Sequence, residues 1–291
     1  MLHYSIKDLE KLSGIKAHTL RIWEQRYGIL KPERTNTNIR LYSNQELKHI
    51  LNIAILNNKG YKISRIAELS NEQIANEVIK VTEESSSNET VIDLLIIAMS
   101  EMDEDRFEKT VNTSILNIGF EETMNQVVYP FLKKIGIMWQ AGAVAPAQEH
   151  FISNLVRQKL IVAIDSLIYK TNDPEQTFLL FLLEGELHEI SLLYTYYLLK
   201  KGGKRVIYLG QSVPYNDLQS IIDTKKPAFV VSIFTCQLIN SNTQDYINQL
   251  SSDFTKTKIM VSGFQVMNPN LITPPNITIF KEPYHLLDLI K

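Results

Sequence analysis

Cysteine is almost absent from this chain, whose 291 residues include a single one, Cys236. One thiol excludes intrachain disulfides and zinc sites built from several thiolates. A lone cysteine in an apolar segment is most often a small buried hydrophobe, and we expect this of Cys236. Long apolar runs are also missing, since FLLFLL at residues 178–183 is too short to span a bilayer and the N-terminus has no signal-peptide pattern. The sequence therefore predicts a cytoplasmic protein with no membrane partner.

A strong net charge is lacking as well, because the formal value is only −2, but this value hides an asymmetry. Residues 1–75 contain 12 Lys/Arg and 7 Asp/Glu, a net of +5, which leaves 18 and 25, a net of −7, for residues 76–291. Only the first quarter of the chain is suited to a polyanion such as DNA.

The first 30 residues show helical spacing of apolar side chains on both sides of Gly14, which predicts a helix-turn-helix. Ser5 is the expected N-cap of the first helix. The stretch LKPERTNTNIRLYS then predicts a short hairpin, or wing, followed by helices at about 44–58 and 62–69. The side chains expected to meet DNA lie at the start of the second helix and on the wing: Lys16, His18, Thr19, Arg21, Arg26, Arg34, Arg40 and Tyr42.

This order of elements resembles the DNA-binding domain of the MerR family. The resemblance rests on YSIKDLEKLSGIKAHTLRIWEQRYGIL, on the IRLYS exit of the wing and on ELKHILNIAILNNKGYKISRIAEL. It implies a dimeric winged helix-turn-helix protein whose recognition helix enters the major groove of operator DNA. Many relatives sense metals through cysteines in a dimerisation helix, and this chain has none there.

Beyond the first quarter, the sequence predicts a multidomain protein of the α plus α/β class. We expect a winged helix-turn-helix domain at residues 1–75 and a linker at 76–89 around TEESSSNE. Helical periodicity at about 90–101, 103–118, 120–139 and 146–168 predicts a four-helix bundle at residues 90–170. Alternating short apolar runs and helical segments predict a doubly wound parallel sheet of Rossmann or flavodoxin type at residues 175–291.

In doubly wound folds, ligands bind at the loops that follow the strands. The loop GELHEIS after the first strand places Glu186 and His188 at that edge, while Ser232, Ser262 and Gly263 end the third and fourth strands. Position alone would equally suit an exposed histidine of no function.

The pattern at these strand ends resembles the cobalamin-binding module of mutases, methyltransferases and regulators, whose signature is acid-x-His-x-x-Gly, Ser-x-Leu and Gly-Gly. The resemblance implies that His188 binds cobalt from below, that Glu186 orients it, and that Ser191, Ser232, Ser262 and Gly263 line the slot for the nucleotide tail. Three positions depart from the pattern, since Ser191, Phe234 and Ser262 stand where the family has glycine, leucine and glycine.

The stretch MWQAGAVAPAQEH at residues 138–150 resembles the bundle motif of light-sensing adenosylcobalamin regulators of the CarH and LitR type. The resemblance implies that Trp139 packs beside the adenosyl group, with Glu149 and His150 near the same pocket. Core packing of Trp139 and a helix N-terminal role for Glu149 are the alternative interpretations. Gln140 stands where some relatives have a histidine that binds cobalt after the adenosyl group is lost.

Together these features favour a transcriptional repressor, not an enzyme, that binds adenosylcobalamin, senses light through its photolysis and assembles as a dimer or tetramer on operator DNA. An alternative is a regulator with an empty, degenerate cobalamin fold that is controlled by an antirepressor protein or by oligomerisation. An enzyme of methyl transfer or rearrangement would need substrate-activating domains, whereas a DNA-binding domain occupies their place in this chain.

Overall fold

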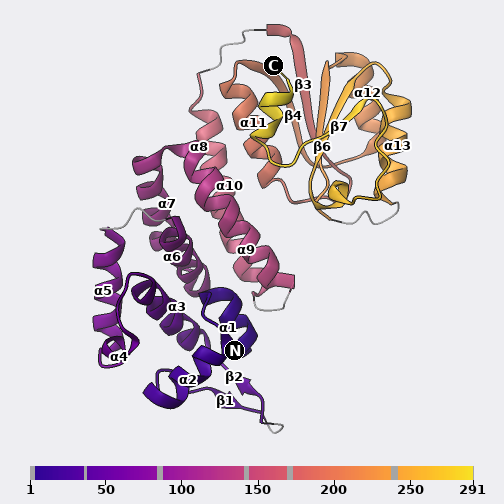
Figure 1. Cartoon of the computed structure of the whole chain (residues 1–291). Coiled ribbons are helices and arrows are strands. Elements are labelled where there is room, and N and C mark those ends of the chain that lie inside the picture. Colours follow the sequence, from indigo (N-terminus) through magenta and orange to yellow (C-terminus); the bar gives the residue numbers. More distant parts are fainter. Residues whose placement is uncertain are drawn as a thin grey trace. The chain divides into compact units, whose positions relative to one another are not determined.

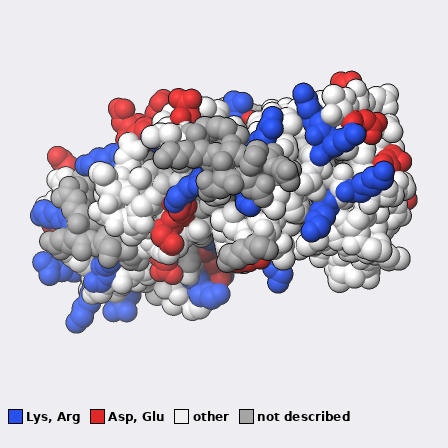
Figure 2. All heavy atoms as spheres, turned by 90° about the horizontal axis from the view of Figure 1, so that it is seen from above, with Lys and Arg blue, Asp and Glu red and all other residues white. Residues whose placement is uncertain are grey.

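The structure is a computed structural model that describes residues 4–35, 38–83, 88–140, 144–168, 173–236 and 242–290. The chain forms two compact units, Met1–Leu155 and Val156–Lys291 (Figure 1). None of the described helices is both long and apolar enough to cross a membrane. On the face drawn in Figure 2, Lys and Arg side chains are interspersed with Asp and Glu, in keeping with the small net charge.

The first unit begins with the expected winged helix-turn-helix. Ser5 caps the first helix in a capping box with Asp8, and Gly14 ends it in the left-handed region at φ 72°. A two-stranded wing follows the second helix, and Ser43 with Glu46 forms another capping box at the helix after the wing. The elements are α1 (Ile6–Ser13), α2 (Ala17–Tyr27), β1 (Glu33–Arg34), β2 (Arg40–Leu41), α3 (Asn44–Asn58) and α4 (Ile63–Ile66).

The expected linker at residues 76–89 is wrong over most of its length. Helix α5 (Asn71–Glu83) covers its first eight residues, and α6 (Asn88–Glu101) begins before it ends; residues 84–87 lie outside the described part of the chain. The buried residues Ile74, Val78 and Val81 recur at helical spacing and pack α5 against α3, which outweighs the polar composition of the segment. The winged helix-turn-helix and α6 to α9 therefore lie in one compact unit.

The four helical blocks of the expected bundle are present. They are α6, α7 (Glu104–Ile118), the run α8 (Phe120–Thr123), η1 (Met124–Val128) and α9 (Tyr129–Gln140), and finally α10 (Pro146–Asp165). The π-helical turn η1 precedes Pro130, which has no N–H to donate and whose ring would clash with the carbonyl one α-turn earlier. The buried side chains of these helices include Leu95, Phe107, Val127, Phe131, Ile135 and Ile152.

The second unit is a five-stranded parallel sheet, as predicted. Its strand order is β4-β3-β5-β6-β7, which in chain order is the flavodoxin-like arrangement 2-1-3-4-5. In this arrangement the chain reverses direction across the sheet between β3 and β5, so a crevice for ligands is expected at their carboxyl ends. The strands are β3 (Asp173–Leu183), β4 (Lys204–Val213), β5 (Phe229–Ile233), β6 (Lys258–Ser262) and β7 (Ile277–Ile279).

Helices cover both faces of this sheet (Figure 1). Phe178, Leu180 and Leu182 of β3 face one buried cluster, and Leu179, Phe181 and Leu183 face the other, as the alternation of a strand requires. Leucines of α11 (Ile190–Lys201) and α14 (His285–Leu289) complete the first cluster. Side chains of α12 (Tyr215–Lys225) and α13 (Thr243–Asp253) complete the second.

Candidate functional site

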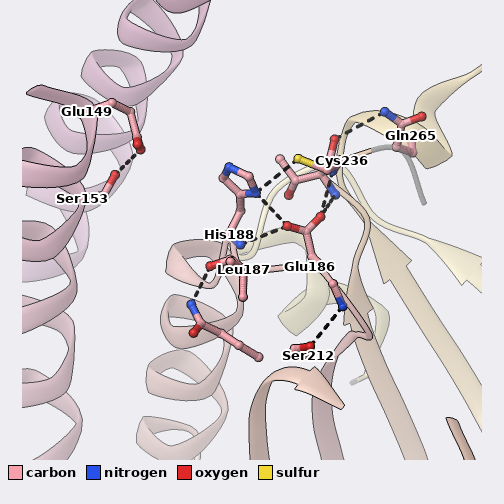
Figure 3. A network of polar contacts seen from close by, with 11 residues as sticks. Glu149, Ser153, Glu186, Leu187, His188, Ser212, Cys236 and Gln265 are labelled. Atoms are coloured by element: carbon pink, nitrogen blue, oxygen red, sulfur yellow. Dashed lines mark hydrogen bonds and ion pairs between the residues drawn. The ribbon is translucent and has the colours of Figure 1, made fainter. Parts of the chain in front are cut away.

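A buried carboxylate organises the crevice between β3 and β5. Glu186 is only 3% exposed and follows β3 by three residues. Its Oε1 accepts hydrogen bonds from the backbone N–H of His188 at 3.0 Å and meets His188 Nδ1 at 2.7 Å. Its Oε2 accepts the backbone N–H groups of Thr235 at 3.0 Å and Cys236 at 2.8 Å (Figure 3). One side chain thus joins the loop after β3 to the loop after β5.

These hydrogen bonds keep Glu186 ionised. Burial alone would raise the pKa of the Glu186 carboxyl, but bonds from the His188 side chain and from the backbone N–H groups of Cys236 and His188 lower it to about 2. Because an ionised carboxylate only accepts hydrogen bonds, the proton of a neutral His188 ring lies on Nδ1. The lone pair is then on Nε2, at the opposite edge of a ring whose side chain is 54% exposed.

Hydrogen bonds to β4 fix the rest of this loop. Gly185 N–H donates to Ser212 Oγ at 3.0 Å, and Ser212 N–H donates to the Glu186 carbonyl at 3.2 Å. Gln211 Nε2 donates to the Leu187 carbonyl at 2.5 Å. Gly185 lies at φ 84°, a conformation that a side chain would strain. The loop that presents His188 is therefore held at both its backbone and its side chains.

A second buried carboxylate anchors the start of α11. Glu189 is 5% exposed, pairs with Arg157 of α10 and accepts a hydrogen bond from Tyr208 OH of β4 at 2.9 Å. Burial and the negative charge of Glu189 raise the pKa of Tyr208, so this hydroxyl stays protonated and donates. Glu189 was not singled out in the sequence, although it directly follows His188.

Cys236 differs from expectation, because it is exposed and not a buried hydrophobe. Its Sγ lies 3.3 Å from His188 Nδ1. The ligand atoms of Glu186, His188 and Cys236 all lie within 4.8 Å of one another, a grouping that could hold a metal ion. The separation of 48 positions between His188 and Cys236 hides this proximity from any local pattern, and only the position of Cys236 just after a strand end could have indicated it.

The strand-end serines have different surroundings. Ser232 is fully buried on β5, and its Oγ has no hydrogen-bond partner among the residues that the structure describes, which costs about 1–3 kcal/mol when nothing satisfies it. Ser262 Oγ donates to the Lys281 carbonyl at 3.2 Å, and the Ser191 carbonyl accepts Thr195 Oγ at 2.7 Å. An orphaned hydroxyl at Ser232 is what a slot for a polar ligand group would leave, so this residue fits the implied nucleotide tail.

Phe234 and Gly263 close the same region. The Phe234 ring is 1% exposed and meets Tyr246 of α13 edge-on, with ring centroids 6.0 Å apart. A Cβ on Gly263 would lie 2.4 Å from the Phe234 carbonyl oxygen, and Gly263 has φ 105°. Gly263 is thus required by the approach of the Phe234 backbone even without a ligand. A tail could enter here only if the Phe234 and Tyr246 side chains moved.

The three bundle residues lie in the first unit. Trp139 is 53% exposed near the end of α9, so it is not part of the bundle core, in contrast to its buried neighbour Met138. Glu149, in the first turn of α10, accepts Ser153 Oγ at 2.5 Å and lies 3.7 Å from His150 Nε2. The exposed Trp139 side chain and the exposed His150 side chain are therefore both accessible to a ligand.

The second helix of the helix-turn-helix presents a polar face. His18, Arg21 and Arg26 are exposed, whereas Leu20 and Trp23 are buried on the other side of α2. Ile22, at 51% exposed, and Gln25 lie on the same face as Arg21, and both were missed although helical spacing from His18 would have found them. Thr19 is half-buried beside this face.

Several other DNA-contact expectations change. Tyr42 is fully buried and its hydroxyl donates to Glu24 at 3.2 Å, so the prediction that it reaches phosphates is wrong. Arg40 pairs with the same carboxylate at 3.0 Å and holds the wing to α2. Lys16 is exposed and pairs with Glu10, and Arg34 is exposed on the wing, donating to Asn38 at 2.7 Å.

Comparisons with known proteins match two separate stretches of the chain, the first over the winged helix-turn-helix and the second over the helices α6 to α10. Residues 4–73 match the model of the MerR HTH family of regulatory proteins, and residues 91–163 match a B12 binding domain. Over 234 residues the chain is 28% identical to the HTH-type transcriptional repressor CarH of Myxococcus xanthus, covering 78% of this chain and 77% of that protein. The HTH-type transcriptional repressor CarA of Myxococcus xanthus is 27% identical over 231 residues, or 79% and 75% of the two chains. The monomethylamine corrinoid protein of Methanosarcina barkeri shares the fold, with a TM-score of 0.56 and 14% identity over 70% of this chain and 98% of that one.

Proposed function

The chain is a MerR-type DNA-binding regulator with a B12-binding domain, and we propose that it represses transcription while holding adenosylcobalamin with cobalt on His188 Nε2. The observation that carries this proposal is the hydrogen bond of 2.7 Å between Glu186 and His188 Nδ1. It leaves the metal-binding lone pair on Nε2, and a carboxylate behind a metal-bound imidazole also strengthens the ligand. This hydrogen bond supports His188 as the proposed cobalt ligand.

Separate groups of residues have separate proposed roles in binding adenosylcobalamin. Glu186 and the β4 contacts hold the His188 loop in place, and Ser232 offers an unsatisfied hydroxyl to the nucleotide tail. Trp139, Glu149 and His150 are the bundle groups proposed to contact the adenosyl side. Ser191, Ser262 and Gly263 complete the proposed lining. The Ser191 carbonyl and the Ser262 hydroxyl already form hydrogen bonds, and Gly263 packs closely against the Phe234 backbone.

Bound adenosylcobalamin would supply a cobalt–carbon bond that light can break, and this is the proposed input signal. A ligand can only shift an equilibrium by its differential affinity for two states. We therefore expect the intact cofactor to favour an oligomer, a dimer or a tetramer, that places several recognition helices on operator half-sites. Loss of the adenosyl group would favour a form that binds DNA less tightly.

On the DNA side, α2 is the proposed recognition helix. Arg21 is the side chain proposed to reach base edges, while Arg26, Lys16 and the wing's Arg34 add phosphate contacts. Arg40 already pairs with Glu24 and is assigned to positioning the wing. No reaction is proposed for the chain, since CarH and CarA, whose matches cover 78% and 79% of it, are named as transcriptional repressors.

The test is a purification in darkness with adenosylcobalamin, followed by the visible spectrum of the protein before and after green light. We expect a coloured wild type and a His188→Ala variant that has lost the ligand or shows the spectrum of a cofactor without a histidine ligand. His285→Ala, on α14 and without a proposed role in binding, is the matched control for losing an imidazole from the same unit. DNA sites selected from a random library should bind more tightly in darkness than after light; a colourless wild type would reject the proposal.

A second candidate is a regulator whose cobalamin fold stays empty and is controlled by an antirepressor protein or by oligomerisation. The edge-on packing of the Phe234 ring against Tyr246, in the region implied for the nucleotide tail, favours this alternative. A Phe234→Leu variant that gains colour where the wild type has none would support this alternative. A wild type that binds cobalamin as tightly as Phe234→Leu would remove it.

A further inference from the structure

We infer that Glu186, His188 and Cys236 form a binding site for a divalent cation of intermediate softness, such as Zn²⁺. One carboxylate oxygen, imidazole Nδ1 and one sulfur would supply three protein ligands. This site lies on the opposite edge of the His188 ring from the cobalt position proposed above. It concerns the protein without cobalamin and does not depend on the proposed function.

The three ligand atoms are already close to the spacing that zinc needs. His188 Nδ1 lies 2.7 Å from Glu186 Oε1 and 3.3 Å from Cys236 Sγ, and all three atoms fit within 4.8 Å. Ligand atoms of a tetrahedral zinc site with bonds of about 2.0–2.3 Å are about 3.3–3.8 Å apart. A cation could therefore enter after the Glu186 and His188 atoms separate by about 0.6 Å or more from their distance of 2.7 Å.

The fold brings these three ligands together before any cation binds. Parallel pairing of β3 with β5 aligns the two loops, and the N–H groups of Thr235 and Cys236 bind Glu186 Oε2 (Figure 3). Gln265 Nε2 adds a bond of 3.4 Å to the Thr235 carbonyl. This anchoring uses Oε2 and leaves Oε1 to face His188 and Cys236.

The chemistry of the three groups selects the cation. Imidazole nitrogen, thiolate and carboxylate are all zinc ligands, whereas Mg²⁺ and Ca²⁺ prefer oxygen alone. His188 and Cys236 are exposed, so water could complete the coordination from solvent. Glu186 is buried and ionised, and a cation would take the place of the proton that now lies between Nδ1 and Oε1.

A cation at Nδ1 also excludes cobalt at Nε2, a consequence that rests on the proposed function. A neutral imidazole has one nitrogen with a lone pair, so a metal on Nδ1 moves the ring proton to Nε2. His188 would then have no lone pair for cobalt. Occupation of the Glu186–His188–Cys236 site is therefore expected to weaken binding of cobalamin, and cobalamin is expected to weaken binding of zinc by the same factor.

The first experiment uses untagged, full-length protein that has been purified without cobalamin and treated with a chelator. Co²⁺ is added as a spectroscopic probe and then displaced with Zn²⁺. Because Cys236 is the only cysteine, a sulfur-to-cobalt charge-transfer band can come only from this site. We expect the band to saturate at one equivalent, to disappear on adding zinc and to be absent from Cys236→Ala.

Variants decide whether the zinc is bound at a defined site. We expect Cys236→Ala and His188→Ala to lower zinc affinity by at least about tenfold and His285→Ala, on α14, to leave it unchanged. Far-ultraviolet circular dichroism shows that each variant is folded. A folded wild type with no charge-transfer band would overturn the site, as would equal zinc affinity in wild type and Cys236→Ala, which indicates adventitious binding only.

A second experiment separates this inference from the proposed function. Hydroxocobalamin is added to wild type and to Cys236→Ala, each with and without zinc. Zinc should lower cobalamin affinity of wild type at least about tenfold and leave Cys236→Ala unaffected. A wild type that binds zinc but no cobalamin would contradict the proposed function and support the zinc site. Equal cobalamin affinity with and without saturating zinc would overturn the exclusion.

Discussion

Tyr4 and Tyr42 pair their backbones in an antiparallel bridge, with N–H to carbonyl distances of 2.8 and 2.9 Å. Both side chains are buried, and each hydroxyl donates to another element: Tyr4 to Asn44 of α3 at 2.6 Å, and Tyr42 to Glu24 of α2 at 3.2 Å. This bridge ties the N-terminal segment, the exit of the wing and the recognition helix together. Tyr4 also hydrogen-bonds with Gln148 of α10, which connects the bundle to the DNA-binding elements.

The buried position of Tyr42 predicts that Tyr42→Phe affects stability and not DNA contacts. Removing the hydroxyl deletes one hydrogen bond to a charged acceptor, for a loss of about 1–2 kcal/mol. Glu24 keeps its ion pair with Arg40, so the orientation of α2 should persist. Thermal unfolding measures the loss, and a DNA titration should give a wild-type affinity. A tenfold weaker affinity without a change in stability would restore Tyr42 as a direct contact.

The two arginines on α2 and the wing should behave differently. Arg21→Ala is expected to weaken DNA binding by about 1–3 kcal/mol and to relax preference at one base position, because Arg21 is exposed on the recognition face. Arg40→Ala should mainly lower the melting temperature, since it leaves Glu24 without its cation. Titrations of both variants over a series of salt concentrations test this. Equal losses of affinity would mean that Arg40 contacts DNA as well.

The carboxylate behind His188 predicts a pH-dependent stability. The pKa of Glu186 falls to about 2 in the folded protein, from an ordinary value of 4.5. A depressed pKa stabilises the fold fully above the ordinary value, and the contribution is lost as pH falls from there toward about 2. Wild type should therefore exceed Glu186→Gln in stability at neutral pH, by on the order of 3 kcal/mol, and the difference should shrink in acid.

Urea unfolding of wild type and Glu186→Gln at several pH values measures this difference. Glu68→Gln, at an exposed position in the first unit, is a control for removing one negative charge. A difference between wild type and Glu186→Gln that stays constant between pH 7 and pH 3 would contradict the assigned cause.

Gly263 tests the packing beside Phe234, and Gly136 in α9 is the control for adding a methyl group to a glycine. Gly263→Ala should destabilise the second unit by about 2 kcal/mol or more, because the new Cβ would lie 2.4 Å from backbone oxygen in a conformation that L residues rarely adopt. Gly136→Ala in α9 meets nothing within 4 Å and should stabilise by up to about 1 kcal/mol. Thermal unfolding of both variants makes the comparison. A neutral Gly263→Ala would show that the Phe234 backbone moves easily, as an entering nucleotide tail would require.

Local patterns in the sequence were sufficient for the elements and their order. The glycine between two amphipathic helices, the capping residues Ser5 and Ser43 and the alternation of β3 depend on residues within a few positions of one another. The helix-turn-helix, the helical blocks and the five parallel strands follow from them, as does the position of His188 at the carboxyl end of β3. The linker prediction failed because polar residues at 82–89 concealed the apolar spacing of α5.

Only the tertiary structure decided which side chains meet across long separations. Tyr42 is buried because it pairs with Tyr4, and Cys236 lies against His188 because β3 pairs with β5 and Glu186 binds the loop after β5. From its local segment alone, Tyr42 is predicted to contact phosphate, and Cys236 is predicted to be a core residue. The sequence by itself determined the domains' secondary structure and the candidate cobalt ligand, since these depend on short-range periodicity and strand ends. Burial, pairing and the three-residue cluster depend on contacts between segments tens of residues apart, which chain packing alone brings together.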